Sequence, residues 1–380
     1  MVLEAARKDT RIRYVTPGSV GMRANFEFAL DQVKPGYVIA LGGDDGILPY
    51  GISQMWSALQ ETGMDILTWR PLMFLYPAVR SGKGQLGVYR PGKSKILRSR
   101  EYLARQASDL NYLNDFETPM FYIKGVVATR LIDQVRSRTA DGRFYVCPTP
   151  DGFSGIVLAG EVEKYAFSGM PYSIGGTSPT AQGLAYLSTG DEAKKLSESF
   201  FRAVSDVPMH RDLASQPYSP LISVMTADYL LTAKDLPGWP GDVPAIDYKN
   251  LLVKGLKELA YAMYATDRVN RELVILYKIA QYHGLETFFR QKIAAMERSR
   301  SIKPFVGNGI TPSQILLDCD MFQICNIFDA AYASYTVCQL ISKINFGMAT
   351  KTIADSLQYG MRQRQKGYSF PPESEWIMEA

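Results

Sequence analysis

The spacing of apolar residues changes along the chain. In the first half, apolar and β-branched residues form short runs that predict strands, at 11–15, 37–41, 65–69, 72–76, 121–125, 144–147 and from 171. Stretches with helical spacing separate them, at 21–30, 51–59, 126–135 and 153–159. This alternation predicts an α/β domain over residues 1–190.

From residue 191 onward the pattern predicts helices. Apolar residues recur at helical spacing within 191–206, 219–233, 247–265, 268–281, 284–298, 312–346 and 348–363. Prolines and glycines interrupt these segments, and the stretch 236–241 predicts a rigid connection. We therefore expect a mostly helical C-terminal domain over residues 191–380.

Composition supports two ordinary globular domains. The chain has 380 residues, 46% of them hydrophobic and 21% charged. A net charge of +4 is small for this length and gives no reason to expect nucleic acid as a partner. The chain shows no leader pattern and no apolar run long enough to cross a bilayer, so we expect a cytoplasmic protein. The basic residues of 359–366 could rest on the inner face of a membrane, or form a solvated helix end.

Cysteine and histidine give little scope for metal or acid–base chemistry. The four cysteines lack paired spacing, and Cys319, Cys325 and Cys338 fall in an apolar region typical of core positions. The two histidines are His210 and His283. We interpret His210 as an ordinary loop residue, with contact to a leaving diphosphate as the alternative.

The most informative stretch follows the run 37–41. Two glycines, Gly42 and Gly43, remove side chains where the backbone turns, and Asp44 and Asp45 follow at the carboxyl end of the predicted strand. Adjacent carboxylates repel each other unless water or a divalent cation separates them. A simple Asp-Gly turn that binds nothing is the alternative.

Residues 9–69 resemble the family-two glycosyltransferases of the A-type fold, and the resemblance continues more loosely to about residue 189. It rests on a short strand, a helix carrying Asn25, a Gly-Tyr-Val strand at 36–38, the acidic pair and Pro49. The resemblance implies a partial Rossmann-like sheet and a nucleoside-diphosphate sugar as donor, with a saccharide, lipid or protein as acceptor. It also implies Mn²⁺ or Mg²⁺ held by Asp44 and Asp45, with Gly43, Asp44 and Asn25 beside the donor. Many members carry a further Asp where this chain has Gly42 or Gly43.

Asp151 is the second carboxylate that the resemblance singles out. It follows the predicted strand 144–147 and precedes the predicted helix 153–159, where Asp is a favoured N-cap. A carboxylate here is the catalytic base in the resembling family, and the two roles are compatible. Sugar transfer would then proceed with inversion at the anomeric carbon. The loop 171–178 is rich in small residues and would lie beside the acceptor.

The basic, glycine-rich segment 80–98 predicts a solvated loop or hairpin, or a lid over phosphates. About 35 residues precede the predicted strand 37–41, which is about half of what two complete strand–helix units plus the helix and strand seen here require. The rival interpretations are therefore a non-catalytic truncated remnant or interaction module of the same family, and a metal-dependent phosphohydrolase. Two-metal phosphohydrolases generally need more carboxylates and histidines than this sequence offers.

Overall fold

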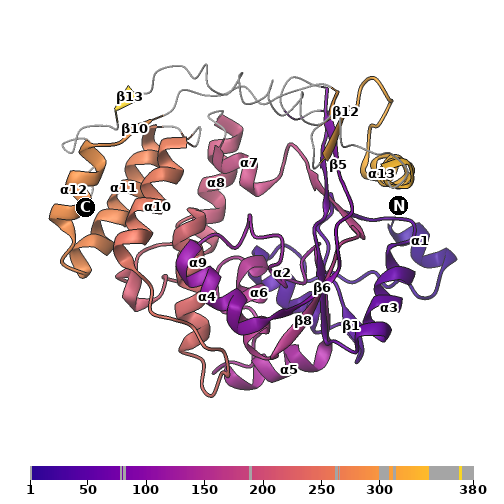
Figure 1. The fold of residues 1–380 in the computed structure, drawn as a ribbon, viewed down its shortest axis with the longest axis horizontal. Helices are drawn as coiled ribbons and strands as arrows, with labels where there is room; N and C mark the ends of the chain where they lie inside the picture. The colour runs from indigo at the N-terminus through magenta and orange to yellow at the C-terminus, as the bar shows by residue number, and fades with distance from the viewer. Residues whose placement is uncertain are drawn as a thin grey trace.

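The computed structural model describes residues 2–77, 79, 83–187, 191–261, 264, 266–298, 308–310, 314–341 and 368–369. Strands and helices alternate through the first half, and helices predominate in the second (Figure 1). The predicted α/β class, a sheet region followed by a mostly helical C-terminal region, is confirmed. The boundary after residue 190 stays a prediction.

Two mixed sheets carry the strands of the first half. The five-stranded sheet has the order β1 (Tyr37–Val38), β7 (Gly125–Ala128), β3 (Ile66–Trp69), β8 (Lys164–Ser168) and β6 (Lys95–Arg98). The six-stranded sheet has the order β11 (Gly309–Ile310), β12 (Gln314–Asp318), β5 (Gln85–Tyr89), β4 (Leu72–Leu75), β9 (Ser173–Thr177) and β2 (Gly46–Ile47). The β3–β8 and β4–β9 pairs are parallel, and the other pairs in both sheets are antiparallel.

Helices cover the sheets on both sides (Figure 1). One side carries α2 (Met22–Leu30), α4 (Ser99–Asp109), α5 (Thr129–Arg138), α6 (Pro150–Gly160) and α9 (Ile222–Lys234). The other side carries α3 (Gly51–Thr62) and α13 (Ile327–Ile341), with α1 (Val2–Lys8) beyond them. The far end of the molecule is formed by α10 (Tyr248–Tyr261), α11 (Thr266–Tyr282) and α12 (Glu286–Ala294). The remaining elements are α7 (Gln182–Leu187), α8 (Asp191–Ala203), the short 3-10 helix η1 (Arg211–Leu213), β10 (Glu297–Arg298) and β13 (Tyr368–Ser369).

The largest core surrounds α6. Ten of the eleven residues of this helix are buried, since α4, α5 and α9 pack around it. Gly160 at its end allows the ring of Trp239 to approach, and the Trp239 indole donates to the carbonyl of Val157 at 2.9 Å. The predicted rigid connection 236–241 is thereby fastened to α6. The same core runs from α2 to α12 and so joins the α/β part to the helices.

Several predicted elements are wrong in detail. Residues 11–15 form no strand, and 37–41 are not a fully buried strand, because β1 is a two-residue edge strand with Tyr37 exposed. The predicted strand 121–125 begins only at Gly125, and 144–147 is buried but irregular. Neither 11–15 nor 144–147 pairs with a described strand, so an apolar run alone does not produce a strand there.

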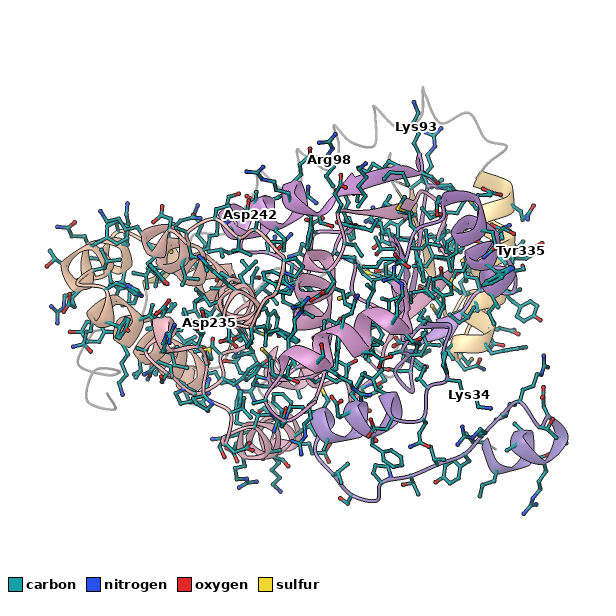
Figure 2. All side chains as sticks on the ribbon, turned by 90° about the horizontal axis from the view of Figure 1, so that it is seen from below. Lys34, Lys93, Arg98, Asp235, Asp242 and Tyr335 are labelled. Carbon is teal, nitrogen blue, oxygen red and sulfur yellow. The ribbon has the colours of Figure 1, made fainter. Side chains whose placement is uncertain are left out.

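Two further segments differ from expectation. Within 80–98, the described part of the segment contains two strands, of which β5 is largely buried between β4 and β12. Lys93 and Arg98 point outward, as expected of a solvated segment (Figure 2). Within 312–346, residues 314–318 form β12, and only α13 is helical among the described residues. The predicted helix 348–363 and the basic stretch 359–366 lie outside the described residues.

Cys319 and Cys338 are buried, as predicted, but Cys325 is exposed, so its placement in the core was wrong. Among the described residues, no helix combines the length and apolarity needed to span a bilayer.

Candidate active site

The acidic turn lies between the edge of the five-stranded sheet and β2. Its backbone closes with a hydrogen bond from the Asp45 N–H to the Gly42 carbonyl at 3.3 Å. The Asp45 carboxylate points back into the protein, where Oδ2 accepts from the Gly42 N–H at 2.8 Å and Oδ1 from the Gly176 N–H of β9 at 3.1 Å. Asp45 therefore fastens the turn to the second sheet.

Asp44 has a different environment from its neighbour. Its Oδ2 accepts one long hydrogen bond, 3.3 Å from the Ser178 N–H, and its backbone carbonyl accepts from the Tyr76 hydroxyl at 3.3 Å. No described residue donates a hydrogen bond to Oδ1 of Asp44. A Cβ at Gly176 would lie 1.9 Å from the Asp44 carbonyl oxygen, so the close approach of β9 requires glycine. Asp44 thus has a carboxylate oxygen left for a ligand.

Tyr122 joins the acidic turn to the first sheet. Its hydroxyl lies beside the Asp45 carboxylate, at the space that Gly42 leaves open, and its ring packs edge-on against Phe26 with centroids 5.8 Å apart. Burial raises the pKa of the Tyr122 hydroxyl, and the charges of Asp45, Asp151 and Asp44 raise it further. The three candidate carboxylates therefore act on a single phenol, which brings them to one region of the molecule.

Burial also raises the pKa of Asp45. The N–H groups of Gly42 and Gly176 and the hydroxyl of Tyr122 lower it by smaller amounts, and the charge of Asp44 raises it. The hydrogen bonds thus only partly compensate the carboxylate for the water that it has lost.

Asp151 lies in the first turn of α6. Pro150 opens this helix and Thr149 precedes it, so Asp151 is not the N-cap, contrary to our expectation. Burial raises the pKa of the Asp151 carboxyl, while the N–H groups of Gly152 and of Asp151 itself lower it. A carboxyl with a raised pKa, at the start of a helix, is suited to take up a proton.

Phenols surround Asp151. After burial, the charge of Asp151 is among the causes that raise the pKa values of the hydroxyls of Tyr112, Tyr145, Tyr218 and Tyr229. A Cβ at Gly152 would lie 2.4 Å from the Tyr229 ring, so this glycine lets the phenols close around the start of α6. The Thr149 hydroxyl hydrogen-bonds with Tyr229.

Asn25 lies on α2, next to Phe26, whose ring contacts both Tyr122 and Tyr145 at 5.8 Å. The Asn25 residue is exposed, and so is Gly43, where an added Cβ would meet nothing within 4 Å. Asn25 and Gly43 are therefore both accessible to a ligand. Their contact with a donor stays a prediction.

The side chains available as metal ligands bear on the predicted Mn²⁺ or Mg²⁺ ion. No group of three or more His, Cys, Asp or Glu side chains suited to a metal ion occurs within the described residues. Mg²⁺ in nucleotide enzymes usually takes one or two carboxylates and completes its shell with phosphates and water. Asp44, with a carboxylate oxygen free, fits such a cation. Each oxygen of Asp45 already accepts one hydrogen bond, so fewer of its lone pairs are left for a cation, and its role as a metal ligand stays a prediction.

His210 has a structural role. Its Nδ1 accepts from the Asp212 N–H at 3.1 Å, and its Nε2 lies 3.0 Å from the Asp235 carboxylate. Asp235 is found among the helices, on the opposite side of the molecule from Tyr335 of α13 (Figure 2). The other histidine, His283, stacks on Tyr248 with centroids 3.5 Å apart.

Sequence reasoning missed Tyr122. A tyrosine within an apolar run is typical of core, and no local signal sets Tyr122 apart. In the loop 171–178, the N–H groups of Gly176 and Ser178 donate to Asp45 and Asp44, and the predicted place of this loop beside the acceptor stays a prediction.

No protein-family model matches the chain, and no curated protein matches it. Among solved structures, the crystal structure of S. aureus TarS 1–349 in complex with UDP-GlcNAc aligns with a TM-score of 0.34 and 11% identity, covering 76% of this chain and 79% of that chain. A second crystal structure of S. aureus TarS 1–349 aligns with a TM-score of 0.29 and 11% identity, covering 76% and 78%. These alignments are too distant to transfer an activity, so the function has to be inferred from the residues of this chain.

Proposed function

We propose that the chain is a metal-dependent glycosyltransferase that moves a sugar from a nucleoside diphosphate to an acceptor hydroxyl, with inversion. The observation that carries the proposal is the position of Tyr122, whose hydroxyl lies beside Asp45 at the space left by Gly42, with Asp44 and Asp151 close enough for their charges to raise its pKa. A cation-binding carboxylate and a carboxyl with a raised pKa in one region are what this reaction needs.

The two carboxylates of the acidic turn have separate tasks in this proposal. Asp44 is the protein ligand of a Mn²⁺ or Mg²⁺ ion, since its Oδ1 accepts no hydrogen bond from the described residues. Asp45 holds the turn through Gly42 and Gly176. The cation, when bound, supplies positive charge against the departing diphosphate.

Asp151 is the general base. Its carboxylate accepts the proton of the acceptor hydroxyl, and the acceptor oxygen bonds to the anomeric carbon as the bond from that carbon to the diphosphate breaks. Because burial raises the pKa of Asp151, the carboxylate binds this proton more readily than an exposed aspartate would. Attack from the face opposite the leaving group inverts the anomeric centre. Asn25 and Gly43, both exposed, are assigned to donor contacts.

The test is release of nucleoside diphosphate from a panel of UDP-, GDP- and dTDP-sugars with Mn²⁺ and candidate acceptors. We expect Asp44→Asn to abolish Mn²⁺-dependent binding of the nucleoside diphosphate in thermal-shift measurements. Asp151→Asn should keep that binding and lose transfer by about a hundredfold or more. Release of inorganic phosphate from simple esters, lost in Asp44→Asn, would favour the phosphohydrolase instead.

One observation favours a second candidate, an interaction module without catalysis. β1 is the edge of its sheet and is two residues long, and Tyr37 and Leu41 beside it are 38% and 39% exposed. The unpaired backbone N–H and C=O groups of this edge and the two large exposed side chains are the features that a partner strand would contact. If no nucleoside diphosphate shifts the melting temperature with or without Mn²⁺, this candidate replaces the enzyme.

A further inference from the structure

Tyr122 is followed by an unusual backbone turn. The Lys124 N–H donates to the Tyr122 carbonyl at 2.7 Å, and Ile123 between them has a φ of 59°. A hydrogen bond from residue i+2 to residue i with positive φ at the centre defines the rare, strained form of the γ-turn. A β-branched residue seldom adopts positive φ, because its side chain crowds the following backbone.

The surroundings hold this turn from both sides. The Ile123 N–H donates to the Ala40 carbonyl at 2.8 Å, and the Ile123 carbonyl accepts from the Ser173 hydroxyl. The Lys124 carbonyl accepts from the Trp69 N–H at 3.0 Å. Ile123 itself is 7% exposed, and its side chain packs beside Gly175 of β9. The strain persists because both sheets fix the turn.

The turn sets where the Tyr122 hydroxyl lies. A Cβ at Gly42 would be 2.6 Å from this oxygen and 2.8 Å from Oδ2 of Asp45, so the phenol fills the space that the missing side chain of Gly42 leaves. On the other side, the Tyr122 ring packs on Phe26 of α2. Backbone, ring and hydroxyl are thus each held by a different part of the protein.

We propose that Tyr122 is a positioning residue of the site: held by the γ-turn at Ile123, its hydroxyl keeps Asp45 turned inward and leaves Asp44 directed to the cation and the diphosphate. The proposal deepens the function proposed above and rests on it. Without the Tyr122 hydroxyl, the space beside Gly42 is no longer filled, so Asp45 is free to turn outward and compete with Asp44 for the cation. Both carboxylates then remain, but they no longer hold one fixed arrangement around the cation.

The first test compares Tyr122→Phe with Tyr165→Phe. Tyr165 is buried, and its hydroxyl donates to the Glu117 carbonyl at 3.0 Å. Its variant therefore also loses a tyrosine hydroxyl, but one that lies outside the site. The readout is the loss of the free Mn²⁺ signal in electron paramagnetic resonance as protein is added with UDP. We expect Tyr122→Phe to weaken UDP-dependent Mn²⁺ binding about tenfold, and Tyr165→Phe to bind like the wild type.

The second test compares Ile123→Gly with Ile123→Ala, which lose nearly the same packing but differ in tolerance of positive φ. Glycine normally destabilises relative to alanine, but at this position we expect an unfolding equilibrium constant about fivefold smaller for Ile123→Gly. Ile123→Gly should nevertheless bind Mn²⁺ with UDP more weakly than Ile123→Ala, because the relaxed turn no longer fixes Tyr122. Stability and binding then rank the two variants in opposite orders.

The possible outcomes distinguish a failure of this positioning role from a failure of the proposed function. If the wild type removes no Mn²⁺ signal with UDP, GDP or dTDP, the proposed function fails. Equal binding by Tyr122→Phe and the wild type, with binding present, overturns the positioning role alone. So does an Ile123→Gly variant less stable than Ile123→Ala, which would show that the turn stores no strain.

Discussion

Replacing Asp228 by asparagine should stabilise this protein at neutral pH. Asp228 lies on α9, is 4% exposed, and its Oδ1 accepts from the His210 N–H at 2.7 Å. Asparagine has nearly the same shape and keeps an oxygen for this hydrogen bond. The substitution therefore removes a buried charge and little else.

The magnitude follows from the proton affinity of the group. Burial raises the pKa of Asp228 to about 6 from its ordinary 3.8, and the His210 N–H and the charge of His210 only partly oppose it. Because the folded pKa is the higher one, the folded state binds this proton more tightly. The stability that the group contributes is complete below pH 3.8 and is lost as the pH rises through about 6. A shift of about two units corresponds to about 3 kcal/mol at pH 7.

Urea denaturation at a series of pH values measures this directly. The difference in free energy of unfolding between Asp228→Asn and the wild type should move in favour of the variant by about 2–3 kcal/mol between pH 4 and pH 7.5. A pH-independent effect of the new amide on the free energy of unfolding is the same at every pH, so it does not contribute to this change with pH. Asp235→Asn is the matched control, since the Asp235 side chain also faces His210 but is 44% exposed. A difference that stays constant with pH would refute the reasoning.

Two further predictions concern the site and its support. Gly42→Ala should abolish UDP-dependent Mn²⁺ binding, because its Cβ would lie 2.6 Å from the Tyr122 hydroxyl, whereas Gly43→Ala should leave the melting temperature unchanged, since nothing lies within 4 Å. If Gly43→Ala nevertheless weakens binding, a ligand approaches that backbone, as the sequence predicts. Burial lowers the pKa of Lys124 to about 7 from 10.5, so the unfolded chain binds more protons between these values and stability from this group rises with pH across them. Lys124→Met should remove that rise between pH 7 and 9 in urea denaturation, and an unchanged slope would contradict the assignment.

The sequence predicted elements whose patterns are local. The strands β3, β4 and β9 lie inside the predicted runs, and Gly63 ends α3 in the left-handed conformation that a helix-terminating glycine adopts. The helix predicted over segment 314–318 is wrong because its short apolar run, 315–317, fits a helix or a strand equally well. Its conformation is decided by pairing with β5, which local periodicity does not contain.

The same limit applies to the site. The acidic turn and Asp151 stood out from the sequence, because carboxylates after apolar runs are conspicuous. The proposed division of tasks between Asp44 and Asp45 was not predictable, since Asp45 accepts from Gly176, far along the chain, and lies beside Tyr122, which directly precedes the positive φ of Ile123. Asp45 as a metal ligand stays a prediction, and the structure adds that each of its oxygens accepts a hydrogen bond.

The pairing of β12 with β5 has a consequence for biosynthesis. Gln314 lies opposite Tyr89, so about 225 residues are added by the ribosome after β5 before its partner exists. At about 5–20 residues per second this takes about 10–45 seconds. During that interval Leu86 and Val88, both fully buried in the finished protein, belong to a strand with one open side. The nascent chain is then a natural client for a chaperone that shields unpaired strands.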